Sequence, residues 1–296
     1  MALNLATFKT RTLTAIIFVV VMLAGLLWNH WSFFILFSII HFGCWREYQR
    51  LVGLIDADYR AVSPFHRYGV MLAGWCIMLN FTNDAFNIFG LHLHAIGWFL
   101  GLLFVFILPV IELLFAKDIQ LRNIGYSALG LLYISLSWGL MIDLRCRYMD
   151  LDFLFARVDL GYLFPLLIIG SIWINDTMAY IVGSLIGKTP LSGISPKKTW
   201  EGTIGGIILA VAVMGLINGF FNEFTFAGVG QWMGLAAIAS ITGTAGDLLE
   251  SKLKRSAQVK DSGSFMPGHG GFLDRFDSLL IATPFCWLYI TLVMPA

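Results

Sequence analysis

Long apolar runs alternate with short polar segments along the whole chain. Most runs approach or exceed the roughly 20 residues that a helix needs to cross about 30 Å of hydrocarbon, although the run near 68–82 is short. The runs lie near residues 12–28, 31–45, 68–82, 95–115, 123–143, 160–186, 202–221, 228–246 and 277–295. This pattern predicts an all-α fold, a polytopic integral membrane protein with about nine transmembrane helices.

Composition supports this class of protein. Hydrophobic residues make up 58% of the 296 positions and charged residues only 12%, whereas about a quarter of a soluble domain is charged. The four cysteines are scattered without a close pair, so we interpret them as buried small side chains, not as a disulfide or zinc site. Nothing in the composition points to nucleic acid as a partner.

The positions of the cations predict an orientation. If the N-terminus lies inside, only Arg145, Arg147 and Arg157 of the 19 Lys and Arg residues fall outside. This bias follows the positive-inside rule and predicts a C-terminus outside. We interpret the first apolar run as a retained helix, not a cleaved signal peptide. We treat 1–296 as a single membrane domain, with scaffold helices over about 1–150 and a catalytic motif region over about 160–296.

One charged stretch, Gly246–Ser278, interrupts the apolar pattern near the C-terminal end, and we call it the motif stretch. It combines five acidic residues, five basic residues and a glycine-rich turn at 267–271. The charged residues are Asp247, Glu250, Lys252, Lys254, Arg255, Lys260, Asp261, Asp274, Arg275 and Asp277. Carboxylates hold magnesium, cations neutralise phosphate oxygens, and glycines let backbone N–H groups approach closely. The stretch therefore predicts a metal–phosphate site.

A second polar block lies upstream. Asp176 stands inside an apolar run, where a carboxylate is costly unless it is paired or faces water, so it is a further candidate; a structural hydrogen bond is the alternative. Ser195-Pro196-Lys197-Lys198-Thr199-Trp200-Glu201-Gly202 then precedes a new helix. Lysines and hydroxyls ahead of a helix start suit an anion-binding turn, while topological anchoring would explain only the charge of the lysines.

These residues carry a family resemblance. The pattern Ser251-x-Leu253-Lys254-Arg255-x4-Lys260-Asp261-x-Gly263, then Pro267-x-His269-Gly270-Gly271-x2-Asp274-Arg275-x-Asp277, resembles the signature of phosphatidate cytidylyltransferases, the CDP-diacylglycerol synthases. The sequence departs from this signature at Met266, where Leu, Ile or Phe is expected, but methionine is also apolar. The upstream block resembles the same family, as do Arg11–Thr14 and Glu47–Leu51 more faintly. The resemblance covers essentially the whole chain, and its specific part is 175–278.

The resemblance implies a magnesium-dependent transfer of CMP from CTP to phosphatidate, which gives CDP-diacylglycerol and pyrophosphate. It implies Asp247 and Asp274 as metal ligands and catalytic residues, and Asp277 is either a further ligand or a helix-start carboxylate. We assign Lys254 a catalytic role, which is to neutralise the charge of a substrate phosphate. The substrate-binding candidates are Ser195, Lys197, Lys198, Thr199, Ser251, Arg255, Lys260, His269, Gly270, Gly271 and Arg275. For His269 the alternative role is a hydrogen bond within the glycine-rich turn. Whether a second cation binds beside magnesium is left open.

The expected setting is a bacterial inner membrane with the active site on the cytoplasmic side, among membrane lipids; a homodimer is left open. Two rival functions also fit the residues. A CTP-dependent prenol or dolichol kinase, or another CDP-lipid synthase, would use a similar site on a different lipid. A membrane transporter or lipid-binding protein would use Asp176 in a proton path, although the dense group of cations, acids and glycines on one side argues against it.

Overall fold

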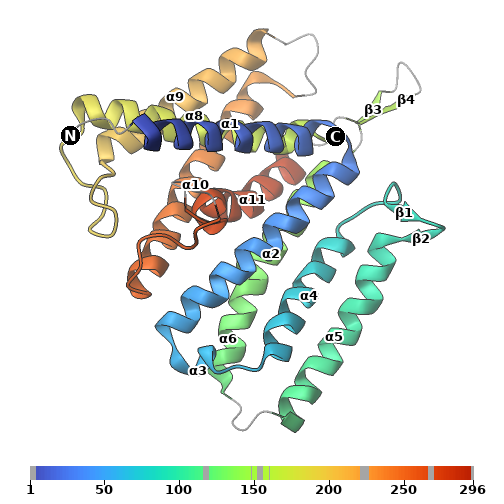
Figure 1. The fold of residues 1–296 in the computed structure, drawn as a ribbon. Coiled ribbons are helices and arrows are strands. Elements are labelled where there is room, and N and C mark those ends of the chain that lie inside the picture. The colour runs from blue at the N-terminus through green and yellow to red at the C-terminus, as the bar shows by residue number, and fades with distance from the viewer. Residues whose placement is uncertain are drawn as a thin grey trace. The chain divides into compact units, whose positions relative to one another are not determined.

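A computed structural model describes residues 5–115, 120–147, 149–151, 156–159, 161–220, 227–265 and 270–294. The fold is helical, as predicted (Figure 1). Its helices are α1 Leu5–Leu27, α2 His30–Ile55, α3 Ala57–Arg60, α4 Pro64–Asn80, α5 Leu93–Phe115, α6 Leu121–Gly130, the π-helix η1 Leu131–Leu136, α7 Ser137–Arg145, α8 Leu163–Ile186, α9 Trp200–Phe220, α10 Val229–Ser256 and α11 Leu273–Val293. The strands in the described part of the chain form two short antiparallel pairs, β1 Asn87–Ile88 with β2 Leu91–His92, and β3 Met149–Leu151 with β4 Ala156–Val158.

Among the described residues, six helical segments are long and apolar enough to cross a membrane. They are Leu93–Leu114, Leu121–Arg145, Leu163–Ile186, Trp200–Phe220, Val229–Ser256 and Leu273–Val293. The first three predicted runs also fall on helices, namely α1, α2 and α4, but these helices are not in the group of six. One reason is that α2 carries Arg46, Glu47 and Arg50 in its second half. The predicted total of about nine spans is therefore not confirmed.

The chain forms two compact units. Unit 1 contains residues 1–146 and 253–275, and unit 2 contains residues 147–252 and 276–296. Most of the motif stretch, from Leu253 to Arg275, thus packs with the N-terminal half of the chain. The N-terminal half contacts the motif stretch directly, for example through hydrogen bonds to Glu47 of α2.

In unit 1, α2 supplies much of the core. Phe33, Phe37 and Trp45 are fully buried along it, and the ring of Phe37 meets that of Trp138 edge-on at 5.1 Å. The Trp45 indole donates a hydrogen bond to the Ser135 hydroxyl over 2.8 Å, so the polar end of this large side chain is satisfied inside the core. These contacts fix α2 against η1 and α7, and therefore fix the orientation of the charged C-terminal half of α2.

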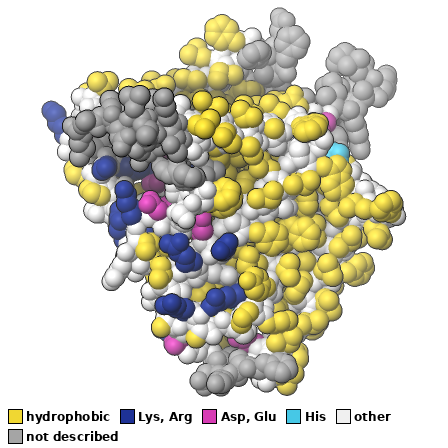
Figure 2. Space-filling view, viewed as in Figure 1, with side chains coloured by type: hydrophobic (Ala, Val, Ile, Leu, Met, Phe, Trp, Pro, Cys, Tyr) yellow, Lys and Arg dark blue, Asp and Glu magenta, His cyan; other side chains and the backbone are white. Residues whose placement is uncertain are grey.

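The face of unit 1 over α4 and α5 is covered by hydrophobic side chains (Figure 2). The two helices pack along one another (Figure 1), and α5 exposes large apolar residues such as Phe99, Phe106 and Leu113. An apolar helix surface of this extent suits contact with lipid. The fold thereby supports an integral membrane protein.

In unit 2, α8 and α9 pack closely because α9 offers small residues to its partner. A methyl group placed on Gly206 would lie 2.8 Å from the carbonyl oxygen of Asn175 and 2.8 Å from Cβ of Ala179. Helices in membranes often approach through such small residues. The close packing brings the end of α8 near the start of α9 and holds the intervening loop, 187–199, in a compact form.

Candidate active site

Asp274, at the start of α11, is surrounded by hydrogen-bond donors in unit 1. Its Oδ2 accepts bonds from the Ser262 backbone N–H at 2.8 Å, the Ser262 hydroxyl at 2.9 Å and the Gly271 N–H at 2.8 Å. Its side chain is only 7% exposed. Charge-assisted bonds of this kind are about twice as strong as neutral ones. Asp274 therefore holds the loop before α11 against the helix start.

Lys254 completes the surroundings of Asp274. Its Nζ lies 2.7 Å from Asp274 Oδ1, and the lysine side chain is 14% exposed. The pair joins the end of α10 to the start of α11, and both ends lie in unit 1. The structure thus brings together two of the residues predicted to be catalytic. It also fixes the lysine ammonium at one point, as the binding of a phosphate oxygen requires.

Glu47 is a further functional candidate, which the sequence analysis included only in a segment of faint family resemblance and to which it gave no role. From α2, its carboxylate accepts hydrogen bonds from the backbone N–H groups of Phe272 and Leu273, both at 2.9 Å, and from the Ser262 hydroxyl at 2.7 Å. It is 8% exposed. A carboxylate at a helix N-terminus satisfies free N–H groups and interacts favourably with the helix dipole. The signal available in the sequence was an acidic residue in a long, largely apolar helix.

The glycine turn fits around these carboxylates. A methyl group on Gly271 would overlap both carboxylate oxygens of Glu47, and Gly270 adopts a left-handed φ of 83°. Both predicted glycines are therefore explained by close approach and by backbone conformation. His269 lies outside the described residues, as does Met266.

In unit 2, the loop 187–199 is closed by its own hydrogen bonds. The Thr199 hydroxyl accepts a bond from the Gly202 N–H at 3.1 Å and so caps α9. The Glu201 carboxylate accepts bonds from the N–H groups of Lys188 and Thr189, each at 3.2 Å. The Lys198 N–H donates to the Ser195 carbonyl at 3.1 Å. Thr199 and Ser195 thus shape the loop, and Glu201 is a second carboxylate whose role was not predicted.

Lys198 connects this loop to α10 within unit 2. Its Nζ lies 2.5 Å from Asp247 Oδ2, with the two side chains 33% and 27% exposed. Asp176 of α8 interacts electrostatically with both Lys198 and Asp247. The structure therefore places three predicted site residues in one group of two acids and one base, which we call the Asp176–Lys198–Asp247 cluster. Its two carboxylates outnumber its single cation.

Asp247 does not end its helix, although the apolar run ends beside it. The helix α10 continues to Ser256 because the following residues, Leu248 to Arg255, are mostly good helix formers. The apolar run therefore stops near Asp247, while the helix itself continues through the polar residues that follow.

The other predicted cations lie at the surface. Lys197, Arg255, Lys260 and Arg275 are exposed. Ser251 is partly buried on α10. Asp277 is 7% exposed within α11, where its Oδ1 accepts the N–H of Ser278 at 2.7 Å. The exposed cations can meet a mobile anion, whereas Asp277 has the surroundings of a structural carboxylate.

A magnesium ion needs oxygen ligands with free lone pairs. Oδ2 of Asp274 already accepts three hydrogen bonds, whereas Oδ1 accepts one from Lys254, so Oδ1 is the oxygen with a lone pair left for a metal. In unit 2, Asp176 and Asp247 offer two carboxylates, and one lysine, Lys198, interacts with both. This second group fits a hard cation.

Comparison with known proteins matches residues 9–293 to the Cytidylyltransferase family. The chain is 34% identical over 223 residues to a phosphatidate cytidylyltransferase of Bacillus subtilis (strain 168), covering 75% of this chain and 77% of that protein. It is 38% identical over 205 residues to the Staphylococcus saprophyticus protein of the same name, covering 62% and 74%. A Synechocystis protein of that name is 42% identical over 139 residues, covering 46% of this chain and 45% of the relative.

Proposed function

The chain belongs to the Cytidylyltransferase family, and we propose from this that it is an integral membrane nucleotidyltransferase that makes CDP-diacylglycerol. It would transfer the CMP group of CTP to phosphatidate and release pyrophosphate. The observation that carries the proposal is the match over nearly the whole length, which includes the motif stretch and its Lys254–Asp274 pair. The product places the protein in phospholipid biosynthesis.

The reaction needs charge neutralisation more than it needs a base. An oxygen of the phosphatidate phosphate attacks the α-phosphorus of CTP, a new P–O bond forms, and the bond to the β-phosphate bridging oxygen breaks. Pyrophosphate leaves with the electron pair of that bond. Because the attacking phosphate is already an anion, the protein has to bring two anions together and stabilise the charge that develops.

Lys254 is the cation of unit 1 that we propose acts on a substrate phosphate. Asp274 fixes its ammonium at 2.7 Å, and Asp274 is itself fixed by Ser262 and Gly271. A cation held in advance loses little freedom when the phosphate binds. Arg255, Lys260 and Arg275 are exposed nearby in the chain and would add to the positive field that attracts CTP.

Lys197 and Lys198 are the corresponding cations of unit 2. Thr199 and Glu201 hold the loop that carries them, and Asp247 orients Lys198. Lys197 is exposed and free to meet an incoming phosphate oxygen. We propose that this loop binds phosphate. Asp247 would position Lys198, and the exposed side chain of Lys197 would turn toward the bound phosphate.

Magnesium is part of the proposal, with the Asp176–Lys198–Asp247 cluster as the group that would hold it. Asp274 and Asp277 were also predicted as ligands, and Asp274 would take that role only through the oxygen that now binds Lys254. When bound, the ion would neutralise phosphate oxygens and the charge on the leaving pyrophosphate. A second cation at the site and a homodimer are also part of the proposal.

The orientation in the membrane is also proposed. We place the site on the cytoplasmic side of a bacterial inner membrane, because all but three of the Lys and Arg residues would then lie inside. Phosphatidate would keep its acyl chains in the bilayer while its headgroup reaches the site.

The test is a product assay with purified full-length protein, CTP labelled in the α-phosphate and a choice of lipid acceptors. Phosphatidate should yield labelled CDP-diacylglycerol and unlabelled pyrophosphate. If the label stays in CMP or CDP while a prenol or dolichol becomes phosphorylated, the kinase alternative is correct. If no acceptor turns over while lipid still binds, a transporter or lipid-binding protein is the better description.

A further inference from the structure

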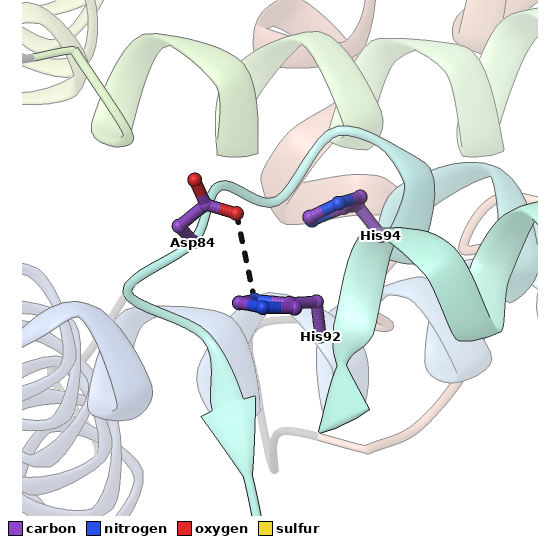
Figure 3. Close-up of side chains that lie close together, drawn as sticks. All are labelled: Asp84, His92 and His94. Atoms are coloured by element: carbon purple, nitrogen blue, oxygen red, sulfur yellow. Dashed lines mark ion pairs between the residues drawn. The ribbon is translucent and has the colours of Figure 1, made fainter. Parts of the chain in front are cut away.

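A group of metal-ligand side chains lies in unit 1, on segments that the proposed reaction does not use. Asp84, His92 and His94 each offer one ligand atom, and these atoms all lie within 4.8 Å of one another. Figure 3 shows the three side chains converging from the loop before β1, from β2 and from the start of α5. Oδ1 of Asp84 lies 3.4 Å from Nδ1 of His92, and the two imidazole rings are 5.4 Å apart between centroids.

The two histidines flank the junction between a strand and a helix. His92 is the last residue of β2, and His94 is the second residue of α5. Leu93 between them is 7% exposed and turns into the core. His92 and His94 are both less buried than Leu93, and their side chains lie close together beside Asp84 (Figure 3).

The segments that carry the three side chains are anchored. The Leu93 N–H donates to the Phe86 carbonyl at 3.0 Å, and Phe86 is 1% exposed, packed against the rings of His30, Trp31 and Phe34. The Asn83 amide donates to the Cys146 carbonyl at 3.0 Å. Residues beside each of the three ligands are thus fixed, while the 85% exposed Asp84 side chain can still adjust.

The polar atoms of this group point to a ligand. Nδ1 of His92 and Nδ1 of His94 are both shielded from solvent, and neither has a hydrogen-bond partner within the described residues. Buried polar atoms normally have a partner. The segment 81–94 also contains no Lys or Arg that would repel a cation. Two imidazoles and one carboxylate are a ligand set that binds zinc and related divalent transition metals.

We propose that Asp84, His92 and His94 form a binding site for a divalent transition metal of the zinc type, separate from the transferase site. With metal–ligand bonds of about 2.0–2.1 Å in tetrahedral geometry, the ligand atoms would sit about 3.3 Å apart. They now lie within 4.8 Å of one another, and the exposed Asp84 side chain is the one with most room to move toward the two histidines. Water would complete the coordination. The bound metal would clamp the β1–β2 hairpin to the start of α5.

The experiment uses the full-length protein, purified in detergent without a histidine tag and treated with a chelator. Zn²⁺ binding is measured by titration, and Co²⁺ is added as a spectroscopic probe of coordination by protein ligands. The variants are His92→Gln, His94→Gln and Asp84→Asn. Leu91→Ala is the matched control, because Leu91 lies in the same hairpin, is 63% exposed and supplies no ligand.

The proposal expects about one equivalent of Zn²⁺ in the wild type and in Leu91→Ala, with a Co²⁺ spectrum of a nitrogen-containing site. Each ligand variant should bind at least about tenfold more weakly, since changes even in outer-shell partners of metal ligands cost 10- to 100-fold. Zn²⁺ should also raise the unfolding temperature of the wild type and not of His92→Gln. Equal Zn²⁺ binding by the wild type and the His92→Gln, His94→Gln double variant would overturn the proposal. CDP-diacylglycerol synthesis is assayed separately, so either result leaves the test of the transferase function intact.

Discussion

Glu47 and Asp274 accept hydrogen bonds from the same hydroxyl group, that of Ser262. The Ser262 oxygen lies 2.7 Å from Glu47 Oε2 and 2.9 Å from Asp274 Oδ2. A hydroxyl has a single proton to donate, so it is shared between the two carboxylates, which are otherwise held by backbone N–H groups and Lys254. Ser262 thus joins α2 to the motif stretch, and the geometry around Lys254 depends on all three residues.

Replacing Ser262 by alanine should impair both stability and turnover. The change removes the donor between two buried carboxylates, and an unmade bond to a buried polar group costs about 1–3 kcal/mol. The unfolding temperature and the rate of CDP-diacylglycerol synthesis are the measurements. Ser264→Ala is the control, because Ser264 is an exposed serine of the same loop. Equal behaviour of the two variants would mean that the shared hydroxyl is unimportant.

Glu47→Gln should destabilise unit 1 while preserving side-chain size. A glutamine has one acceptor oxygen, so only one of the Phe272 and Leu273 N–H groups keeps a good partner. We expect a loss of about 1–3 kcal/mol in the free energy of unfolding. Arg46→Gln removes a charge from the adjacent exposed position of α2 and serves as the control. A Glu47→Gln protein as stable as this control would contradict the capping role.

Asp274→Asn should lower turnover by roughly 100- to 1000-fold, the usual cost of losing a group that stabilises transition-state charge. Asp261→Asn, an exposed carboxylate of the same stretch, should retain activity. The magnesium dependence separates two roles. If Asp274 is a metal ligand, higher magnesium should partly restore the rate. If it acts by holding Lys254, magnesium should not help, and Lys254→Gln should add little to the defect. Near-normal turnover of Asp274→Asn would exclude both roles.

Gly206→Ala should weaken the packing of α8 against α9. The added methyl would lie 2.8 Å from the carbonyl oxygen of Asn175, so the helices would have to separate. Gly219→Ala in the same helix meets no atom within 4 Å and is the matched control. It should be neutral or slightly stabilising, because alanine favours helix by up to about 1 kcal/mol. The comparison is made by thermal unfolding in one detergent. A Gly206→Ala protein that unfolds with the control would disprove the close approach.

Cysteine labelling tests the proposed orientation. In a Cys146→Ser background the remaining cysteines, Cys44, Cys76 and Cys286, are buried. Single cysteines at Lys260 and Leu91, both exposed, are then treated with a membrane-impermeant reagent in intact and in opened cells. Leu91→Cys should react in intact cells and Lys260→Cys only after opening. Reaction of both from the same side would require a different topology.

The sequence by itself determined the helical class and the family. Apolar runs of about 20 residues indicate helices in a membrane, since a helix gives nearly every backbone N–H and C=O group a partner inside its own segment. The residues of the motif stretch were likewise readable, because their types and spacing are local. The sequence also predicted buried cysteines, and Cys44, Cys76 and Cys286 are buried, whereas Cys146 is partly exposed.

Only the tertiary structure decided which groups meet. Glu47 and Leu273 are 226 positions apart, and no spacing rule relates residues on different helices, because their meeting depends on how the helices pack. For the same reason the sequence did not predict three pairs of side chains that the structure brings together. They are Lys254 with Asp274, Lys198 with Asp247, and His92 with Asp84. The spacing of residues along one helix or strand determines which side chains share a face. Which distant segment packs against that face is determined only when the chain folds.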